Sequence, residues 1–264
     1  MKWTPEAETA IKKIPLLVRK KVRVRLEKKA RVEGKKIVSL DDVKTTQARL
    51  LSRMGSEIKG FQLKICFGPN GCPNRTNISD QLYQKVETLL KSEDLLSFLK
   101  KRVKGDLKFH HEFKITLADC PNACSQPQIK DIGIIGAVLP AVADETCTQC
   151  EACLETCQEG AIELDTLGPR IDFSRCLKCG KCALACPTGT LTTDCKGYRI
   201  QLGGKLGRHP KIAQELPGLF NEKEVIEIVK ACIAVYKKKS THGQRFAEIF
   251  TDTDFEQLKN KINV

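Results

Sequence analysis

Apolar residues in the first 58 positions recur at the spacing of α-helices. The clearest stripe takes every fourth residue and comprises Ile14, Val18, Val22, Leu26 and Ala30. This spacing places the apolar side chains on one face of a helix. Thr4 and Pro5 fit a helix start ahead of the stripe, and Gly34 fits the end of the striped helix. The pattern predicts a small helical domain over residues 1–58.

A third helix of this domain is predicted over residues 40–53. Ser39 and Asp42 have the spacing of a capping pair at its start. Gly55 follows the last apolar position and is expected to close the helix.

Beyond residue 60, alternating apolar and polar residues predict strands separated by helices. Strands are expected at 61–65, 113–117 and 198–202, and a buried strand with a turn within 132–143. Helices are expected at 79–91, 222–239 and 254–262. Because strands and helices alternate around cysteine-bearing loops, the fold class is predicted as α+β.

Charge is distributed unevenly along the 264 residues, which carry a formal net charge of +13. Residues 1–60 contain 17 Lys and Arg against 7 Asp and Glu, whereas residues 141–190 contain 4 against 8. A basic surface of this kind suits an acidic partner or an anionic cofactor. Nucleic acid fits less well, because the basic segment has one aromatic residue, Trp3, and no base-reading motif.

The sequence predicts neither a signal peptide nor a membrane span. The N-terminus is charged, and the longest uncharged run, residues 132–143, is too short to cross a bilayer and contains Pro140. Fourteen cysteines in a chain of this length do not fit the disulfide framework of a small secreted domain. Thiolates held for metal imply a reducing, anaerobic compartment, so a cytoplasmic metalloprotein is expected.

Eight cysteines form one phrase twice, C-x2-C-x2-C-x3-C, with a period of 29 residues. The two runs are Cys147, Cys150, Cys153, Cys157 and Cys176, Cys179, Cys182, Cys186. Zinc sites usually show two C-x2-C pairs, whereas three cysteines in series closed by a fourth are typical of [4Fe-4S] ligation. In two-cluster ferredoxins the fourth cysteine of each run ligates the other cluster. The predicted ligand sets are therefore Cys147, Cys150, Cys153, Cys186 and Cys157, Cys176, Cys179, Cys182.

Four further cysteines form a split phrase, Cys66-x5-Cys72 and Cys120-x3-Cys124. Split pairs also occur in zinc sites or as core thiols, so the surrounding sequence decides between the interpretations. The strings C-F-G-P-N-G-C, C-P-N-A-C, D-I-G-I-I-G and G-G-K-L-G-R-H-P follow in one order, with G-Q-R-F-A-E-I-F near the C-terminus. Together they resemble the sirohaem and iron–sulfur domain of the sulfite and nitrite reductase family, over about residues 61 to 260.

This resemblance implies a fold and a cofactor site. It implies a sirohaem/4Fe-4S domain at residues 59–140 and 193–264, interrupted by a two-cluster ferredoxin insert at 141–192. The split cysteines would hold a third [4Fe-4S] cluster, and Cys124 would bridge that cluster to the sirohaem iron. Sirohaem carboxylates need cations and close backbone approach. Candidates for these roles are Lys64, Arg75, Gly203, Gly204, Lys205, Arg208 and Lys211.

The resemblance also implies a small oxyanion substrate, sulfite or nitrite, held and protonated by cations over the open face of the sirohaem. The candidate catalytic residues are Lys114, Arg75 and His111. Two features depart from the family. Glu112 stands where the family usually has the first lysine of a pair, and one half-domain is present where larger members have two. A non-catalytic, multi-cluster electron-transfer subunit of a larger redox complex is therefore the alternative hypothesis.

The first 50 residues resemble a second family. The strings W-T-P-E-A, I-P-L-L-V-R-K-K-V-R and S-L-D-D-V are similar to the small C-terminal domain of the dark-operative protochlorophyllide reductase B subunit. That resemblance implies proximity to tetrapyrrole and iron–sulfur chemistry and leaves a tetrapyrrole-processing role open. The expected partners are an electron donor protein, ferredoxin-like or another redox subunit, and further subunits of a homo- or hetero-oligomer. Cys195 and Cys232 belong to no set and are predicted to lie in the core.

Overall fold

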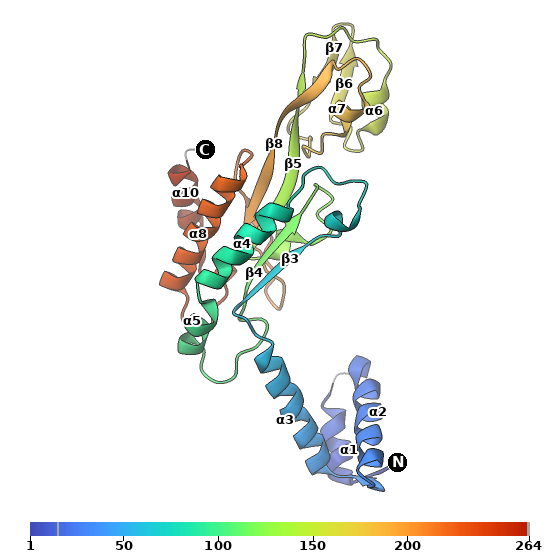
Figure 1. The fold of residues 1–264 in the computed structure, drawn as a ribbon, viewed down its shortest axis with the longest axis vertical. Coiled ribbons are helices and arrows are strands. Elements are labelled where there is room, and N and C mark those ends of the chain that lie inside the picture. Colours follow the sequence, from blue (N-terminus) through green and yellow to red (C-terminus); the bar gives the residue numbers. More distant parts are fainter. Residues whose placement is uncertain (15, 263–264) are drawn as a thin grey trace. The chain divides into compact units, whose positions relative to one another are not determined.

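The computed structural model describes residues 1–14 and 16–262, which form two units, Met1–Ile58 and Lys59–Val264. The first unit contains the helices α1 Pro5–Lys12, α2 Leu16–Val32 and α3 Leu40–Ser56 (Figure 1). Two short parallel strands, β1 Lys2–Trp3 and β2 Ile37–Val38, pair the N-terminal segment with the connection between α2 and α3. Its core consists of Ala7, Ile11, Leu26, Ala30, Val38 and Val43.

The local signals at the helix starts of the first unit are confirmed. Thr4 caps α1, because its Oγ1 accepts the Ala7 N–H at 3.3 Å. Ser39 and Asp42 cap α3 reciprocally, at 2.9 Å and 3.3 Å. The predicted end of α3 is wrong, since the helix continues through Gly55 to Ser56. A glycine in a helix costs only about 1 kcal/mol relative to alanine, which does not compel a stop.

The second unit is built on a five-stranded mixed sheet in the order β3-β4-β5-β8-β9. The first three strands are parallel, and β8 and β9 each run antiparallel to the preceding strand. Their bounds are β3 Phe61–Ile65, β4 Phe113–Ala118, β5 Ile132–Val142, β8 Leu191–Leu202 and β9 Gln214–Glu215. This mixed sheet, together with its helices, agrees with the predicted α+β class.

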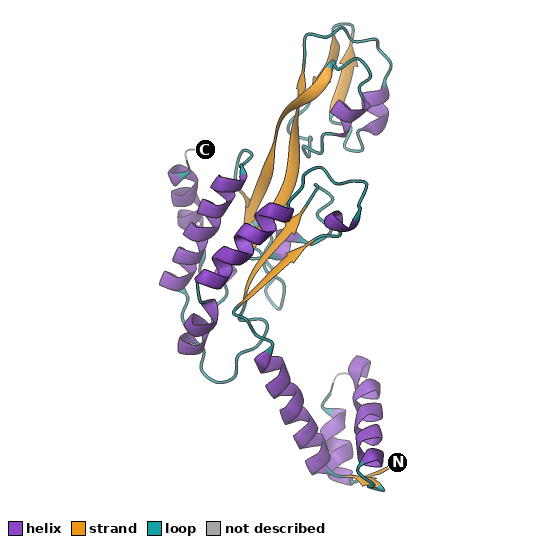
Figure 2. Ribbon diagram, viewed as in Figure 1, coloured by secondary structure: helices purple, strands orange, loops and turns teal. Residues whose placement is uncertain are grey.

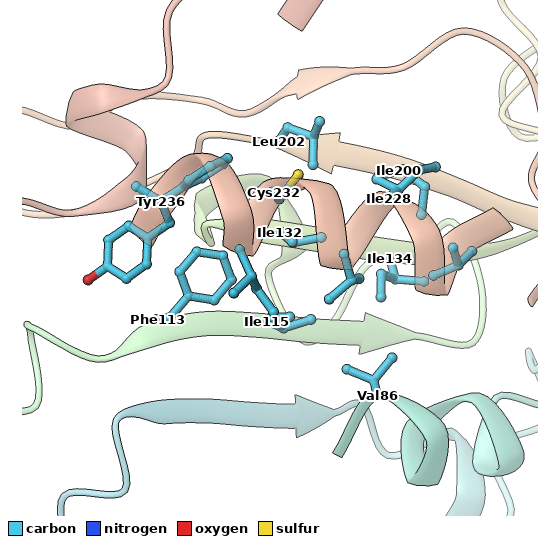
Figure 3. Packing of buried hydrophobic residues seen from close by; sticks show 14 of the residues in the cluster. Val86, Phe113, Ile115, Ile132, Ile134, Ile200, Leu202, Ile228, Cys232 and Tyr236 are labelled. Carbon is cyan, nitrogen blue, oxygen red and sulfur yellow. The ribbon is translucent and has the colours of Figure 1, made fainter. Parts of the chain in front are cut away.

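Helices cover one face of this sheet (Figure 2). They are α4 Asp80–Ser92, α5 Leu95–Arg102, α8 Glu222–Lys239, α9 Phe246–Ile249 and α10 Asp252–Lys261. Phe113 and Ile115 of β4 pack with Ile228 and Tyr236 of α8 in the core (Figure 3). Because side chains alternate along a strand, Lys114 points to the opposite face, which we call the open face. Gln62, Lys64, Thr116 and Gln201 share that face by the same alternation.

Two strands extend beyond the sheet as a long ribbon. β5 and β8 pair from Ile132 opposite Leu202 to Val142 opposite Leu191. The turn expected within residues 132–143 is absent from this strand. Pro140 lies in β5 at a register shift between Leu139 and Pro140. Proline has no N–H to donate, and such an irregularity in the pairing is where a strand tolerates it. The predicted strand at 198–202 is likewise only the last part of β8.

The far end of the ribbon carries the segment with the repeated cysteines (Figure 1). It contains α6 Ala152–Thr156, β6 Ile162–Asp165, β7 Gly168–Ile171 and α7 Lys181–Ala185. These elements were not predicted, because four or five residues are too few to show a period. Their small core includes Cys153, Ile162, Cys182 and Leu191.

The two remaining cysteines differ in burial. Cys232 lies in the core of α8 as predicted, with no exposed surface. The prediction for Cys195 is wrong, since it lies exposed on β8, in the ribbon beyond the helical layer. Among the described residues, no helix combines the length and apolar character needed to cross a membrane.

Candidate functional site

The parallel strands β3 and β4 end at the same edge of the sheet. Cys66 directly follows β3, and Cys120 lies two residues after the end of β4. The Cys66 N–H donates to the Leu117 carbonyl at 2.9 Å, which fixes this arrangement. Cys72 and Cys124 lie in the loops that follow. Burial raises the pKa of Cys120, and the charges of Cys66, Cys124 and Cys72 raise it further. The four thiols of the split phrase therefore share one electrostatic neighbourhood, which we call the edge group.

Backbone N–H groups point at the sulfur of Cys66. Those of Gly68 and Asp119 both lie 3.3 Å from its Sγ. Gly68 permits the close approach, because a Cβ there would lie 2.3 Å from Asp119 Oδ2. N–H donors of this kind stabilise a thiolate and tune a metal-bound sulfur. The chemistry of the edge group therefore fits an iron–sulfur cluster.

Arg75 lies beside this group and is held by two carboxylates. Its Nε lies 2.5 Å from Oδ2 of Asp119, whose side chain is 1% exposed, and its Nη2 binds Asp80. The guanidinium thus links the loop that carries Cys72 to Asp119, the residue directly before Cys120. Its roles toward sirohaem and substrate stay predictions.

The two repeated cysteine runs adopt matching backbone conformations. Positive φ angles recur 29 residues apart, at Gln149 and Lys178, Glu151 and Gly180, and Gly160 and Gly189. The matching N–H groups of residues 149 and 178 lie 3.4 Å from the sulfurs of Cys147 and Cys176. N–H groups also approach Cys157, at 3.3 Å, and Cys186, at 3.4 Å. These turns direct backbone N–H groups at the cysteine sulfurs, as in the loops that ligate iron–sulfur clusters.

Electrostatic coupling groups the repeated thiols across the two runs. Burial raises the pKa of Cys182 to about 11, assisted by the charges of Cys176, Cys179 and Cys157. Cys157 belongs to the first run and the other three cysteines to the second. The thiols that act on Cys182 are therefore those of the crossed ligand set. Within residues 1–14 and 16–262, no three His, Cys, Asp or Glu side chains group as ligands of a single metal ion. The charges that act on Cys182 agree with one crossed set, Cys157, Cys176, Cys179 and Cys182. Both ligand sets and their occupation by clusters stay predictions.

A concentration of cations lies around Asp131. This carboxylate is 1% exposed, accepts the Lys114 N–H at 2.8 Å, and lies 3.0 Å from Arg245 Nη2. Burial, and then the charge of Arg245, lower the pKa of Lys114. Burial lowers the pKa of Lys130 as well, followed by the charges of Lys64 and Arg245. These positive charges repel one another and would be stabilised by an anion. We call the four residues, Lys64, Lys114, Lys130 and Arg245, the cation group.

Polar atoms without partners lie in the same region. Within the described part of the chain, Arg245 Nε, Gln128 Oε1 and Gln201 Oε1 are buried without a hydrogen-bond partner. Such atoms cost free energy unless a ligand or water satisfies them. A ligand with several carboxylates suits both the charges and the unpaired Arg245 donor. The residues present thus fit a tetrapyrrole such as sirohaem.

The glycine-rich turn at residues 203–207 packs against the loop before β5. The N–H groups of Gly203 and Gly204 donate to the carbonyls of Asp131 and Lys130, at 2.9 Å and 2.8 Å. A Cβ at residue 204 would lie 2.5 Å from the Gln128 carbonyl oxygen. Both N–H groups are thus used internally, and the glycines permit this close packing. Their proposed contact with a cofactor stays a prediction.

The other sirohaem candidates have varied surroundings. Lys205 forms an ion pair with Glu248 at 2.6 Å, and Lys211 Nζ donates to the Phe250 carbonyl at 3.4 Å. Arg208 lies exposed in the loop.

His111 does not contact the cation group. Its Nδ1 accepts the Lys108 N–H at 3.1 Å, and its ring lines a surface hollow with His242. The neighbouring His110 is closer in electrostatic terms, because the charges of Lys114 and Arg245 add to burial in lowering its pKa. The catalytic role predicted for His111 therefore gains no support from this geometry.

Residues 66–264 match the family model of the nitrite and sulphite reductase 4Fe-4S domain. The chain belongs to this family. A second model, the proto-chlorophyllide reductase 57 kD subunit, matches residues 3–47. Both resemblances predicted from the sequence are therefore confirmed.

Named relatives of this reductase-family chain differ in how much of it they cover. The coenzyme F420-dependent sulfite reductase of Methanocaldococcus jannaschii is 36% identical over 66% of this chain, which spans 27% of that relative. An uncharacterised protein of the same organism is 29% identical over 59% of this chain and 57% of its own length. The B subunit of the light-independent protochlorophyllide reductase of Pelodictyon phaeoclathratiforme is 54% identical over 41 residues, 16% of this chain and 8% of that protein.

Among solved structures, dissimilatory sulfite reductase I matches with a TM-score of 0.50. The match covers 76% of this chain and 52% of that chain at 16% identity, so it supports the fold alone.

Local sequence patterns did not identify two members of the cation group, Lys130 and Arg245, or its carboxylate, Asp131. Arg245 lies within the C-terminal string, Asp131 is the first residue of the D-I-G-I-I-G string, and Lys130 directly precedes it. No local spacing, however, brings residue 245 to residue 131. Only the folded sheet makes that contact.

Proposed function

We propose that this chain is a sirohaem- and iron–sulfur-dependent reductase of a small oxyanion, with sulfite as the leading substrate and nitrite as the second. The observation that carries the proposal is that an edge group of four thiols and a cation group belong to one sheet. Cys124 is exposed, and the next residue, Ser125, contacts Thr116 of the open face through its carbonyl at 3.5 Å. The thiol expected to bridge the cofactors thus borders the open face.

Each group has its own part in this proposal. Sirohaem, when bound, would supply the iron at which the oxyanion is reduced, and the edge group would hold the [4Fe-4S] cluster that passes electrons to it. Lys114 and Arg245 would neutralise carboxylates and the anion. Burial and cationic neighbours lower the pKa of Lys114, which brings the ammonium closer to the range of a proton donor.

The electron source is proposed to be a separate redox protein that meets the cysteine-rich end of the ribbon. Residues 141–192 would form a two-cluster ferredoxin insert, residues 59–140 and 193–264 the reductase domain, and residues 1–58 an accessory domain. Sulfite is favoured over nitrite because the relative from Methanocaldococcus jannaschii is named a sulfite reductase. A cytoplasmic location and association with further subunits belong to the same proposal.

One observation favours the alternative of a non-catalytic electron-transfer subunit. Glu112 is 2% exposed and accepts the Lys59 N–H at 2.9 Å and Gln62 Nε2 at 2.8 Å. A carboxylate fixed in this way supplies no cation at the position where the family usually has a lysine. Substrate binding would then depend on Lys114, or on residues of another subunit.

Metal and pigment analysis of anaerobically purified protein separates the two proposals. The reductase predicts extractable sirohaem and about thirteen irons per chain, from three cubanes and one haem iron. About twelve irons without pigment would leave the electron-transfer subunit. Where sirohaem is found, oxidation of reduced methyl viologen with sulfite and with nitrite identifies the substrate.

A further inference from the structure

The loop of the second cysteine run is held to the sheet domain by three consecutive carbonyls. The carbonyls of residues 177–179 accept, in order, from Arg199 Nη1 at 3.2 Å, the Val138 N–H at 2.8 Å and Thr76 Oγ1 at 3.3 Å. These donors come from β8, from β5 and from the segment after Cys72. Arg199 is itself fixed by Glu215, through two bonds of 2.7 Å. We call this arrangement the carbonyl clamp.

The first cysteine run has no counterpart of the clamp. Its matching carbonyls belong to residues 148–150, and in the described part of the chain none of them accepts a hydrogen bond from the sheet domain. Gln149 instead donates from its side chain to the Asp165 carbonyl, at 2.8 Å, within the same cysteine-rich segment. The two cysteine runs therefore have the same turn conformations, but among the described residues only the second run is hydrogen-bonded through these carbonyls to the sheet domain.

The same asymmetry is visible at a glycine within the second run, directly after Cys179. Gly180 has φ 70°, and the matching residue of the first run, Glu151, has φ 60°. Since a glutamate adopts this conformation, φ alone does not demand glycine at position 180. A Cβ there would lie 2.8 Å from Val138 Cβ. Gly180 is therefore required by the close approach of the loop to β5.

Thr76 connects the clamp to the edge group. Its N–H donates to the Asp119 carbonyl at 3.0 Å, directly before Cys120, while its hydroxyl holds the Cys179 carbonyl. Pro121 and Asn122, which lie between Cys120 and Cys124, line a small cavity. The same cavity is lined by the four cysteines of one crossed set, Cys157, Cys176, Cys179 and Cys182. Thr76 thus hydrogen-bonds to Cys179 of the crossed set and to Asp119, the residue directly before Cys120 of the edge group.

We infer that the carbonyl clamp fixes the Cys157, Cys176, Cys179, Cys182 set against the edge group, with Thr76 as a positioning residue. This inference rests on the proposed function, because it assumes that both sets hold clusters. One electron would leave the clamped set and enter the edge group, without bond making or proton transfer. The set with Cys147 would then be the outer one and receive electrons from the donor protein.

Thr76→Val tests the clamp, because it removes the hydroxyl and keeps the shape. Loss of one hydrogen bond of about 1 kcal/mol is expected to speed hydrogen exchange of the Val138 N–H about fivefold. In the fully reduced holoprotein, the magnetic coupling between the clamped set and the edge group, measured by EPR, should weaken at unchanged iron content. Thr76→Ser retains the donor and should restore both readouts. Wild-type exchange and coupling in Thr76→Val would overturn the inference.

Gly180→Ala is the stronger variant, and Glu151→Ala is its matched control in the first run. The alanine at 180 should separate the loop from β5 and reproduce both effects of Thr76→Val, whereas the control should change neither. Equal effects of the two alanines would contradict the asymmetry. Hydrogen exchange and cluster coupling require neither sirohaem nor sulfite, so a protein without pigment would refute the proposed reductase and leave this inference standing.

Discussion

Arg245 and Asp131, 114 residues apart in the chain, form a buried ion pair with a distance of 3.0 Å between Nη2 and Oδ1. Their side chains are 12% and 1% exposed. The pair ties the segment before α9 to the start of β5, and Asp131 also accepts the Lys114 N–H. Burial raises the pKa of Asp131, and the charge of Arg245 opposes that rise. The cation group is thus organised around one carboxylate.

Asp131→Asn is expected to destabilise the second unit. The substitution leaves the Arg245 guanidinium buried without its counter-charge, which costs about 3 kcal/mol. Urea unfolding of the apoprotein, followed by circular dichroism, measures this loss. Asp106→Asn, at an exposed carboxylate, is the control and should stay within about 0.5 kcal/mol of wild type. Equal stabilities of the two variants would mean that the ion pair is not formed in solution.

Cys124→Ser is expected to abolish sirohaem coupling while the clusters of the repeated runs remain. The reason is that Cys124 belongs to the edge group and to neither repeated run. EPR of the reduced protein, together with pigment extraction, checks both parts. Cys195→Ser is the matched control, since Cys195 is exposed and belongs to no set. Loss of all clusters at once in Cys124→Ser would show that the cysteine groups do not fold independently.

Gly68→Ala is expected to disturb the edge group. The new Cβ would lie 2.3 Å from Asp119 Oδ2, and Asp119 is held by Arg75 and cannot move freely. Crowding of this kind costs about 1–3 kcal/mol. The expected readout is loss of about four irons per chain, one cubane. Asn70→Ala is the control, because Asn70 lies exposed in the same loop. Full iron content in Gly68→Ala would contradict the close packing.

Asp42 is expected to make the stability of the first unit depend on pH. The hydrogen bond from Lys35, assisted by the Ser39 N–H, lowers the pKa of Asp42 to about 2. Since the folded pKa lies below the unfolded one, this stability is present above about pH 4 and is lost as pH falls toward 2. Lys35 is half-exposed, so solvent screening keeps this contribution small.

The measurement for Asp42 uses Trp3, the single tryptophan of the chain, which packs in the first unit. Asp42→Asn should lower the urea midpoint of its fluorescence at pH 7 and leave it unchanged near pH 2. Asp41→Asn, next to it and exposed, should have no effect at either pH. A pH-independent difference for Asp42→Asn would rule out the ion pair as the cause.

Thiol labelling should distinguish the two cysteines outside the sets. Cys195 is exposed, whereas Cys232 has no exposed surface and burial raises the pKa of its thiol. In the native holoprotein, one alkylated site is therefore expected, at Cys195, by mass spectrometry. Rapid labelling of Cys232 under native conditions would contradict the packing of α8.

Local patterns were sufficient for the elements whose residues are contiguous. The fourth-residue stripe at Val22, Leu26 and Ala30 predicted α2, and α8 was predicted with its observed bounds, because an amphipathic helix depends on nearby spacing. The cysteine sets were predicted for the same reason, since C-x2-C-x2-C-x3-C fixes the ligand spacing within one loop. The continuation of β5 through Pro140 could not be predicted, because it depends on pairing with β8 about sixty residues later.

The sequence by itself determined the helices of the first unit, the α+β class and the family, and it predicted the sets of cysteines. All of these follow from spacings or strings within short segments. The tertiary structure alone decided that Arg245 reaches Asp131, that Arg75 is held by Asp119, and that only the second cysteine run is clamped to the sheet. These contacts join residues up to 114 positions apart, and their free energy exists only once strand order brings the segments together.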